Sequence, residues 1–122
     1  ATISKEPLGP SVLHGDDAWF DAVKWITFGT FFAEEYGITS ANVRERAETA
    51  QNPVVRRFLG LDGDAITQLG LEPDAMVTMI EQVGNYGEMF ERNLGADSQF
   101  GLDRGLNALY TDGGLLYSPP FR

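Results

Sequence analysis

The chain has one histidine, His14, and this is the first side chain whose chemistry has to be weighed. A single imidazole cannot supply the several nitrogen ligands of a His-rich metal site, but it could act as an acid or a base near neutral pH. His14 lies at the end of a short apolar run and just before an expected helix cap. We expect a structural role there, with acid–base chemistry as the alternative.

The segment Asp62-Gly63-Asp64 resembles the start of a calcium-binding loop. An EF-hand loop requires a third oxygen ligand, a central glycine and a final Glu at fixed offsets. Here Ile66 stands at the third ligand position, and Pro73 stands where the final Glu would be. We therefore interpret the segment as a polar turn, and we predict no metal site in the chain.

Two pairs of adjacent carboxylates, Asp16-Asp17 and Glu34-Glu35, could in principle do acid–base work. Such chemistry needs two carboxyl groups that face one site. Neighbours on a helix point about 100° apart, so neither pair is a catalytic dyad by itself. Helix capping explains the aspartates. The glutamates lie near a helix C-terminus, where negative charge is unfavourable, and a salt bridge to another part of the chain would account for them.

No other motif assigns a reaction. Residues 84–87 and 104–114 are rich in glycine, but neither segment follows a strand and opens a helix as a phosphate-binding loop does. There is no serine nucleophile elbow, and the absence of cysteine excludes thiol chemistry and Cys-based zinc sites. We therefore predict a protein that is not an enzyme, with no catalytic residue and no cofactor.

The elements expected around these residues are mostly helices. Short strand candidates at residues 2–4 and 11–14 flank a segment with two prolines and a glycine. Five or six helices of modest length follow. The expected helices are residues 17–36, a helix within 38–51 capped by Thr39 or Ser40, 53–59 opened by Asn52-Pro53, 73–85, 88–95 and 103–114, the last capped by Ser98 or Asp103. The isolated chain is thus expected to be mostly α.

The helix expected at 17–36 is unusually apolar. It carries both tryptophans and four phenylalanines, and these spread over several faces. Only Asp21 and Lys24 mark a polar strip in its middle, so we expect the helix to be buried on most sides. The later helix around Arg44 is polar, and Glu45 and Glu48 are its expected surface partners.

Composition narrows the classes of partner. The chain has 122 residues, of which 43% are hydrophobic and 22% charged, and its formal net charge is −9. So acidic a chain is not expected to bind nucleic acid or an anionic membrane surface. Its longest uncharged apolar run in the first helix, residues 25–33, is too short to span a bilayer, and residues 1–10 lack the features of a signal peptide. We expect small molecules or other proteins as partners.

Four blocks, in this order, carry a resemblance: "ISKEPLGPSVLHGDDAWFDAVKW", "NPVVRRFLG", "QVGNYGEMFERNLG" and "RGLNALYTDGGLLYSPPFR". Together they resemble the C-terminal part of the periplasmic binding proteins of general L-amino acid ABC transporters, which are family 3 bacterial solute-binding proteins. The similarity extends over nearly the whole chain, and the last two blocks are specific to the subfamily.

The resemblance implies part of a two-lobed α/β fold about three times as long as this chain, with the amino acid held between the lobes. Residues 1–41 would be a crossover strand and the long helix that returns to the first lobe. Residues 42–122 would be a helical C-terminal extension, and the two parts would form one structural unit. The arginine and aspartate that hold the substrate in this family lie earlier in its sequence. No stretch here matches those motifs, so the ligand-binding residues stay unknown. Arg44, Arg46, Arg56 and Arg57 are interpreted as surface charge.

The implied function is capture of L-amino acids in the periplasm and their delivery to a membrane permease. The alternative is a self-standing helical interaction module that oligomerises through its aromatic helix. In both cases exposed aromatic surface needs cover, because large apolar patches are unfavourable in water. We therefore expect a homo-oligomer or a domain-swapped assembly of this chain, and no tight binding of an amino acid by the chain alone.

Overall fold

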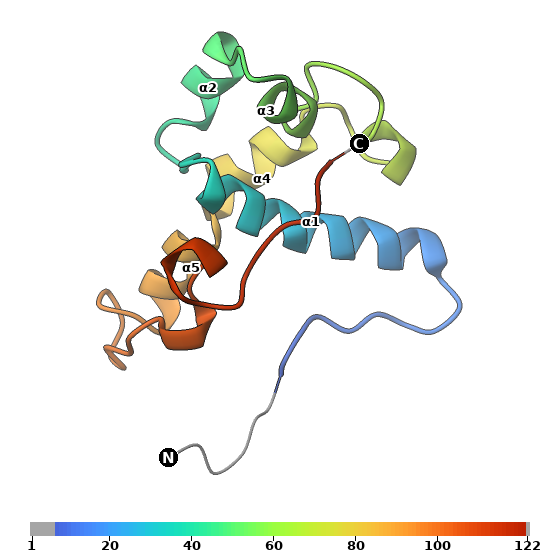
Figure 1. The fold of residues 1–122 in the computed structure, drawn as a ribbon. Helices are drawn as coiled ribbons and strands as arrows, with labels where there is room; N and C mark the ends of the chain where they lie inside the picture. Colours follow the sequence, from blue (N-terminus) through green and yellow to red (C-terminus); the bar gives the residue numbers. More distant parts are fainter. Residues whose placement is uncertain (1–6, 122) are drawn as a thin grey trace.

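The computed structural model describes residues 7–121, and within them the chain is helical with no strand. The first helix, α1 (Asp17–Glu35), is the longest and runs through the middle of the molecule (Figure 1). The Asp16 carboxylate accepts a hydrogen bond from the Trp19 amide at 3.0 Å, and Gly37 follows the C-terminus with φ of 62°. The predicted helix and both of its end signals are therefore confirmed.

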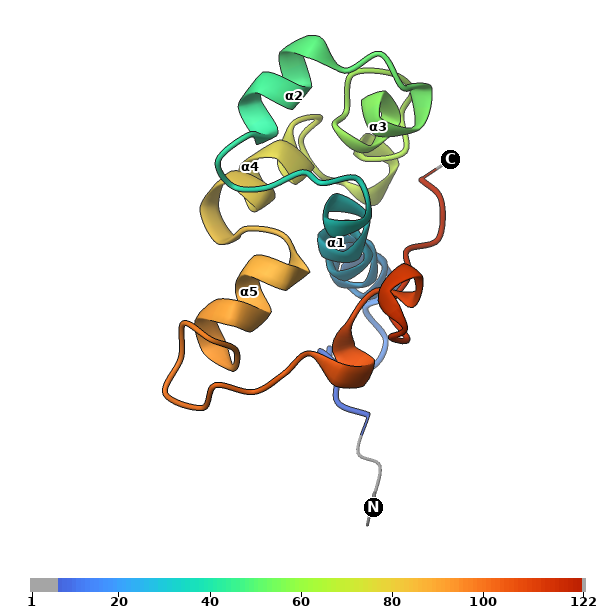
Figure 2. The ribbon, with the colours of Figure 1, turned by 60° about the vertical axis from the view of Figure 1, so that its left-hand side comes forward.

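Four shorter helices and the C-terminal segment surround α1. They are α2 (Val43–Thr49), α3 (Pro53–Phe58), α4 (Ala75–Val83) and α5 (Tyr86–Asn93). Figure 2, which looks nearly along α1, shows α2, α3 and α4 together on one side, α5 on another, and the C-terminal segment on the side opposite α5. Because other segments pack around several sides of α1, apolar residues occur on several of its faces.

The core is centred on the second half of α1. Phe32 is 2% exposed, and its ring lies 4.4 Å from that of Phe58 in α3 and 5.5 Å from that of Phe121 near the C-terminus. Phe121 also contacts Trp25 edge-on at 5.0 Å. The C-terminal tail is thus part of the core. The other core members are Ala33, Ile38, Val43, Val55, Leu59, Ile66, Met76, Val77 and Ile80.

The close crossing of α1 and α4 depends on Gly29. A Cβ atom at this position would lie 3.0 Å from the Met76 sulfur and 3.3 Å from the Met79 methyl group. That spacing leaves no room for a larger residue unless the neighbouring side chains move. A glycine inside a helix lowers the stability of that helix. Its presence here indicates that the close contact between α1 and α4 requires a residue without a side chain.

The strand predicted at residues 11–14 is not formed; the candidate at 2–4 lies outside the described residues. Residues 7–13 have no regular structure and run back below α1 (Figure 1). No backbone hydrogen bond joins residues 7–15 to another described segment. A strand needs a partner for its ladder, and this part of the chain supplies none.

The helix predicted at residues 103–114 is also wrong. Two short 3₁₀ turns, η2 (Gly105–Asn107) and η3 (Tyr110–Asp112), occupy this segment. Gly105 has φ of 50°, and Leu109 forms an isolated parallel bridge with Leu116 that pulls the chain out of helical geometry. A third 3₁₀ turn, η1 (Thr67–Leu69), lies in the loop between α3 and α4.

Several helix boundaries differ in detail from the predictions. The residue that precedes α2 is Asn42, rather than Thr39 or Ser40, and Asn42 instead accepts a hydrogen bond from the Thr39 amide at 2.8 Å. The predicted cap of α3 is confirmed, because the Asn52 side chain accepts a hydrogen bond from the Val54 amide. No helix among the described residues is both long enough and apolar enough to cross a membrane.

Candidate functional site: a polar clasp and an open helix face

The side chains singled out in the sequence are not brought together. His14 is exposed on the N-terminal segment, where it lines a shallow groove with Asp16 and Asp17. Asp62 pairs instead with Arg56, at 2.6 and 3.0 Å, and this guanidinium lowers the pKa of the Asp62 carboxyl. Nowhere in residues 7–121 are three or more His, Asp or Glu side chains placed to hold a metal ion.

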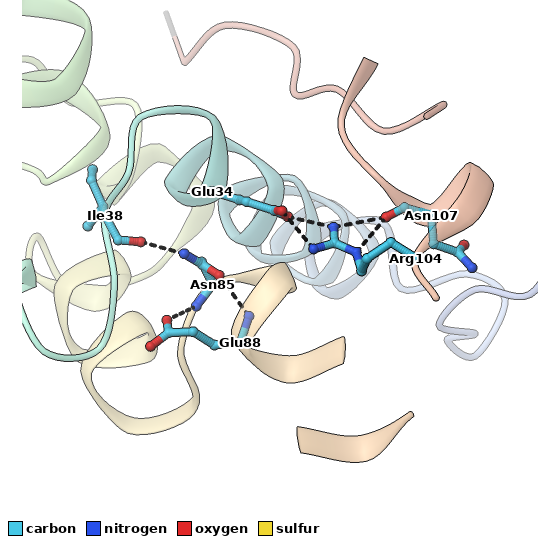
Figure 3. Close-up of polar contacts among 6 residues, drawn as sticks. All are labelled: Glu34, Ile38, Asn85, Glu88, Arg104 and Asn107. Atoms are coloured by element: carbon cyan, nitrogen blue, oxygen red, sulfur yellow. Dashed lines mark hydrogen bonds and ion pairs between the residues drawn. The ribbon is translucent and has the colours of Figure 1, made fainter. Parts of the chain in front are cut away.

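Glu34 forms a salt bridge with a distant part of the chain, which accounts for a glutamate near this helix end. Its carboxylate pairs with the Arg104 guanidinium through Oε1 at 2.8 Å and Oε2 at 3.0 Å (Figure 3). The two side chains are only 16% and 20% exposed. The guanidinium also lies 5.5 Å from the centre of the Tyr86 ring and 5.3 Å from that of Phe90. It donates further hydrogen bonds to the carbonyl oxygen of Asn107. We call Glu34, Arg104 and Asn107 the polar clasp.

A second polar group joins α5 to the turn after α1. The Asn85 side chain is buried; it accepts a hydrogen bond from the Glu88 amide and donates one to the Ile38 carbonyl (Figure 3). Glu88 accepts hydrogen bonds from the Asn85 amide and from Ser40. Burial alone would raise the pKa of Glu88, but these hydrogen bonds hold the pKa below its usual value. Both polar groups therefore fix the positions of segments rather than forming a reactive centre.

Arg44 and Arg46 of α2 and Arg56 of α3 are engaged within the chain, whereas Arg57 of α3 is exposed. Arg44 forms a two-pronged ion pair with Glu81 of α4, so the expected pairing with Glu45 or Glu48 is wrong. Arg46 donates to the Tyr36 carbonyl oxygen at 3.1 Å, which is a contact with the end of α1. The guanidinium groups of Arg44 and Arg46 therefore join α2 to α4 and to the end of α1.

The first half of α1 presents an apolar face that the described chain does not cover. Trp19 and Phe20 keep 54% and 51% of their surface exposed. Beside them lies an apolar groove of about 180 Å³ between the N-terminal segment and α1. We call this surface the open face; it is formed by Pro10, Val12, Trp19, Phe20, Val23, Thr27 and Phe28. On the N-terminal segment, Leu8 and Leu13 are 93% and 85% exposed.

The sequence pattern signals some of these contacts. Asn85 and Glu88 have the spacing of a capping box, which a reader of the sequence can recognise. Arg104 lies 70 positions from Glu34, and nothing local to either residue indicates the pairing. The open face had a signal in the excess of aromatic residues on α1, but the sequence did not show which of them stay exposed.

Comparisons with known proteins agree with the resemblance. The chain is 56% identical to the glutamate/glutamine/aspartate/asparagine-binding protein BztA of Rhodobacter capsulatus and 52% identical to the general L-amino acid-binding periplasmic protein AapJ of Rhizobium johnstonii. It is 48% identical to the putative amino-acid ABC transporter-binding protein YhdW of Escherichia coli. No family model matches the chain.

A solved structure gives the same result. An ABC transporter periplasmic binding protein from Brucella ovis with glutathione bound matches the whole chain with a TM-score of 0.95 and 48% identity, over 38% of its own length. The matches to BztA and AapJ cover 98% of this chain and 36% of each relative. The chain thus corresponds to about a third of the amino-acid-binding periplasmic proteins of ABC transporters, and its helices form part of a periplasmic binding protein fold. The predicted resemblance is confirmed.

Proposed function

We propose that this chain is the C-terminal part of a periplasmic protein that captures L-amino acids and delivers them to the permease of an ABC transporter. The similarity to amino-acid-binding relatives at 48–56% identity supports this function. The relatives' names describe binding proteins, which supports a role without catalysis. The name of the Rhizobium protein supports a periplasmic location.

The observation that carries the proposal is the open face of α1. In a protein three times as long, the remainder of the polypeptide would cover Trp19 and Phe20. The N-terminal segment also exposes Leu8 and Leu13, and its backbone makes no hydrogen bond to another described segment. Such a segment is suited to join a sheet that another part of the protein supplies. We propose that residues 1–41 contribute this strand and α1 to the first lobe.

Residues 42–122 would then be the helical extension that covers the opposite sides of α1. The packing of Phe58 and Phe121 on Phe32 supports a single unit with residues 1–41. Amino acids would bind between two lobes, which close by a hinge motion. The side chains that hold the ligand would lie in the remainder of the protein, and we assign no ligand residue here.

A chimaera tests this proposal. The chain would replace the matching segment of the Rhizobium protein, and amino-acid binding would be measured by calorimetry. We expect the chimaera to bind L-amino acids and the chain alone to show no binding. A chimaera that folds but does not bind, or micromolar binding by the chain alone, would contradict the proposal.

Charged substitutions at Trp19 and Phe20 probe the open face itself. Both residues are half exposed in this chain, so Trp19→Asp with Phe20→Asp should lower the unfolding midpoint of the chain but leave the chain folded. The same pair in the chimaera should abolish folding or binding, because two charges would be buried without partners. Leu61→Asp, at an exposed loop position outside the open face, is the matched control and should preserve binding.

The second candidate function is a self-standing interaction module, and the exposure of Trp19 and Phe20 is the observation that favours it. In that case a second copy of the chain would cover the open face, giving a homo-oligomer or a domain-swapped assembly. Sedimentation of the chain measures this directly. A stable monomer at high concentration would refute the oligomer, and dissociation upon Trp19→Asp with Phe20→Asp would support it.

A further inference from the structure

A second hollow lies at the other end of α1, away from the open face. The end of α1, the start of α3, the turn η3 and the C-terminal tail enclose a cleft of about 320 Å³. Its walls include Phe32, Glu35, Tyr36, Val54, Tyr110 and Ser118. Segments far apart in the sequence therefore converge on one carboxylate. The volume lies at the lower end of the range for small-molecule sites.

Glu35 is the charged group of this cleft, and its partners are few. Its Oε2 accepts a single long hydrogen bond from the Ser118 amide, at 3.4 Å. Among the described residues it takes part in no ion pair, whereas the adjacent Glu34 is neutralised by Arg104. Burial, opposed by the Ser118 hydrogen bond and assisted by the charge of Glu34, raises the pKa of Glu35.

The surroundings of Glu35 favour positive charge. The C-terminus of a helix carries a partial negative charge, and Glu35 is the last residue of α1. Aromatic rings attract cations through their negative faces, and two tyrosine rings, Tyr110 and Tyr36, belong to the cleft; the buried ring of Phe32 is stacked on Tyr36 at 4.4 Å. Val54 adds an aliphatic wall. A carboxylate beside aromatic rings suits a cation that also has an apolar part.

The type of cation follows from the number of oxygen ligands. Calcium requires six to eight oxygen atoms and magnesium an octahedral set, as a rule. The described cleft contains one carboxylate, and no group of three acidic or histidine side chains lies together in residues 7–121. One carboxylate with aromatic neighbours instead matches the recognition of organic ammonium and guanidinium groups.

We propose that the cleft at the end of α1 binds the ammonium or guanidinium group of a small organic cation, with Glu35 as its counter-ion and Tyr36 and Tyr110 beside it. The stem of the cation lies against Val54 and Phe32. The lining of this site consists of residues of this chain, none of which the proposed function assigns to an amino-acid ligand. Its test can therefore fail or succeed whatever the chimaera binds.

The experiment is a titration of the isotope-labelled chain followed by backbone amide shifts. The probes are n-butylammonium and n-butylguanidinium chloride, with n-butanol as the uncharged analogue and sodium chloride to match ionic strength. We expect saturable shifts at Tyr110 and Ser118 with the cations, and at least about tenfold weaker binding of butanol. Equal binding of butanol, or no saturable shift with either cation, would overturn the proposal.

Two variants complete the test. Glu35→Gln keeps the shape of the side chain and should weaken cation binding by at least about tenfold. Glu48→Gln, on the exposed surface of α2, is the matched control and should change nothing. Tyr110 is 59% exposed, so Tyr110→Leu should leave the chain folded while weakening the cations more than butanol. Unchanged affinity in the folded Glu35→Gln chain would refute the assignment.

Discussion

Removal of the Arg104 guanidinium is the sharpest perturbation of this fold. Arg104 joins the segment after α5 to Glu34 of α1, and its planar group lies against Tyr86 and Phe90 of α5. Arg104→Met would keep an apolar stem of similar length and delete the charge together with its hydrogen bonds. Glu34 would then remain largely buried without its partner.

The magnitude can be worked out from the geometry. Across 2.8 Å, two unit charges attract by about 6 kcal/mol at an effective dielectric constant of about 20. The cost of removing both charges from water offsets much of this, so we expect a net coupling of about 2 kcal/mol. Arg104→Met alone should cost about 3–4 kcal/mol, because it also removes two cation–π contacts and leaves a buried carboxylate unpaired.

A double-mutant cycle isolates the coupling. The native chain, Arg104→Met, Glu34→Gln and the double variant would be unfolded in urea and followed by tryptophan fluorescence. The double variant should be less destabilised than the sum of the single variants by about 2 kcal/mol. Arg44→Met is the control; its pair with Glu81 is exposed, so the loss of stability should be much smaller than that of Arg104→Met.

Salt separates the two pairs further. The clasp is mostly buried, so its coupling should persist at about 1 M salt, whereas the exposed Arg44 pair should lose its contribution. A coupling free energy between Arg104 and Glu34 below about 0.5 kcal/mol would refute the reasoning. Deviations from additivity of that size are typical of groups that do not interact. An Arg104→Met chain that unfolds at the same urea concentration as the native chain would also refute the reasoning.

Three further perturbations follow from local geometry. Asn85→Ala should cost about 2–3 kcal/mol in urea unfolding, because it removes a helix cap and leaves the Ile38 carbonyl without its donor. Gly60→Ala should destabilise the chain by more than about 3 kcal/mol, because Gly60 has φ of 73° and an added Cβ would lie 1.7 Å from a backbone oxygen. Gly63 has a similar φ of 75° but open space around it, so Gly63→Ala should cost about 1–2 kcal/mol. Equal unfolding midpoints of the two variants would contradict this. Burial raises the pKa of Glu35, so the folded chain holds this proton more tightly than the unfolded chain does. The resulting contribution to folding stability is complete below the pKa of the unfolded chain and is lost as the pH rises through the pKa of the folded chain. The urea midpoint of Glu35→Gln should therefore rise relative to that of the native chain as the pH is raised from acidic to neutral. A fall of this difference over the same pH range would show the sign to be wrong.

Local signals explain why much of the fold could be predicted. Asp16 and Asn52 mark helix starts because a side-chain oxygen three or two residues before an amide is enough to satisfy it. The capping box of Asn85 and Glu88 is also a local signal, but the helices predicted at 73–85 and 88–95 did not use it, and α5 begins at Tyr86. The resemblance to amino-acid-binding proteins could also be recognised in the sequence, because whole blocks of it are shared.

The failed predictions concern segments whose structure depends on distant partners. Residues 11–14 have the composition of a strand but no neighbouring strand in the described chain, so their propensity has no ladder to join. Residues 103–114 have helical periodicity but form no α-helix. The positive φ of Gly105, the Leu109–Leu116 bridge and the hydrogen bonds of Arg104 favour another backbone path. Tertiary contacts overrode a weak local preference in that segment.

The amino-acid order alone establishes a helical chain with a long aromatic helix, capped at Asp16 and followed by Gly37, because these features depend on residues within one or two turns of each other. Only the three-dimensional packing decides that Trp25 and Phe32 are covered by Phe121 while Trp19 and Phe20 remain open. The same packing gives Glu34 a cation and leaves Glu35 facing a cleft, although the two residues are adjacent. Their different surroundings arise because neighbouring helical side chains point in directions about 100° apart and so meet different distant segments.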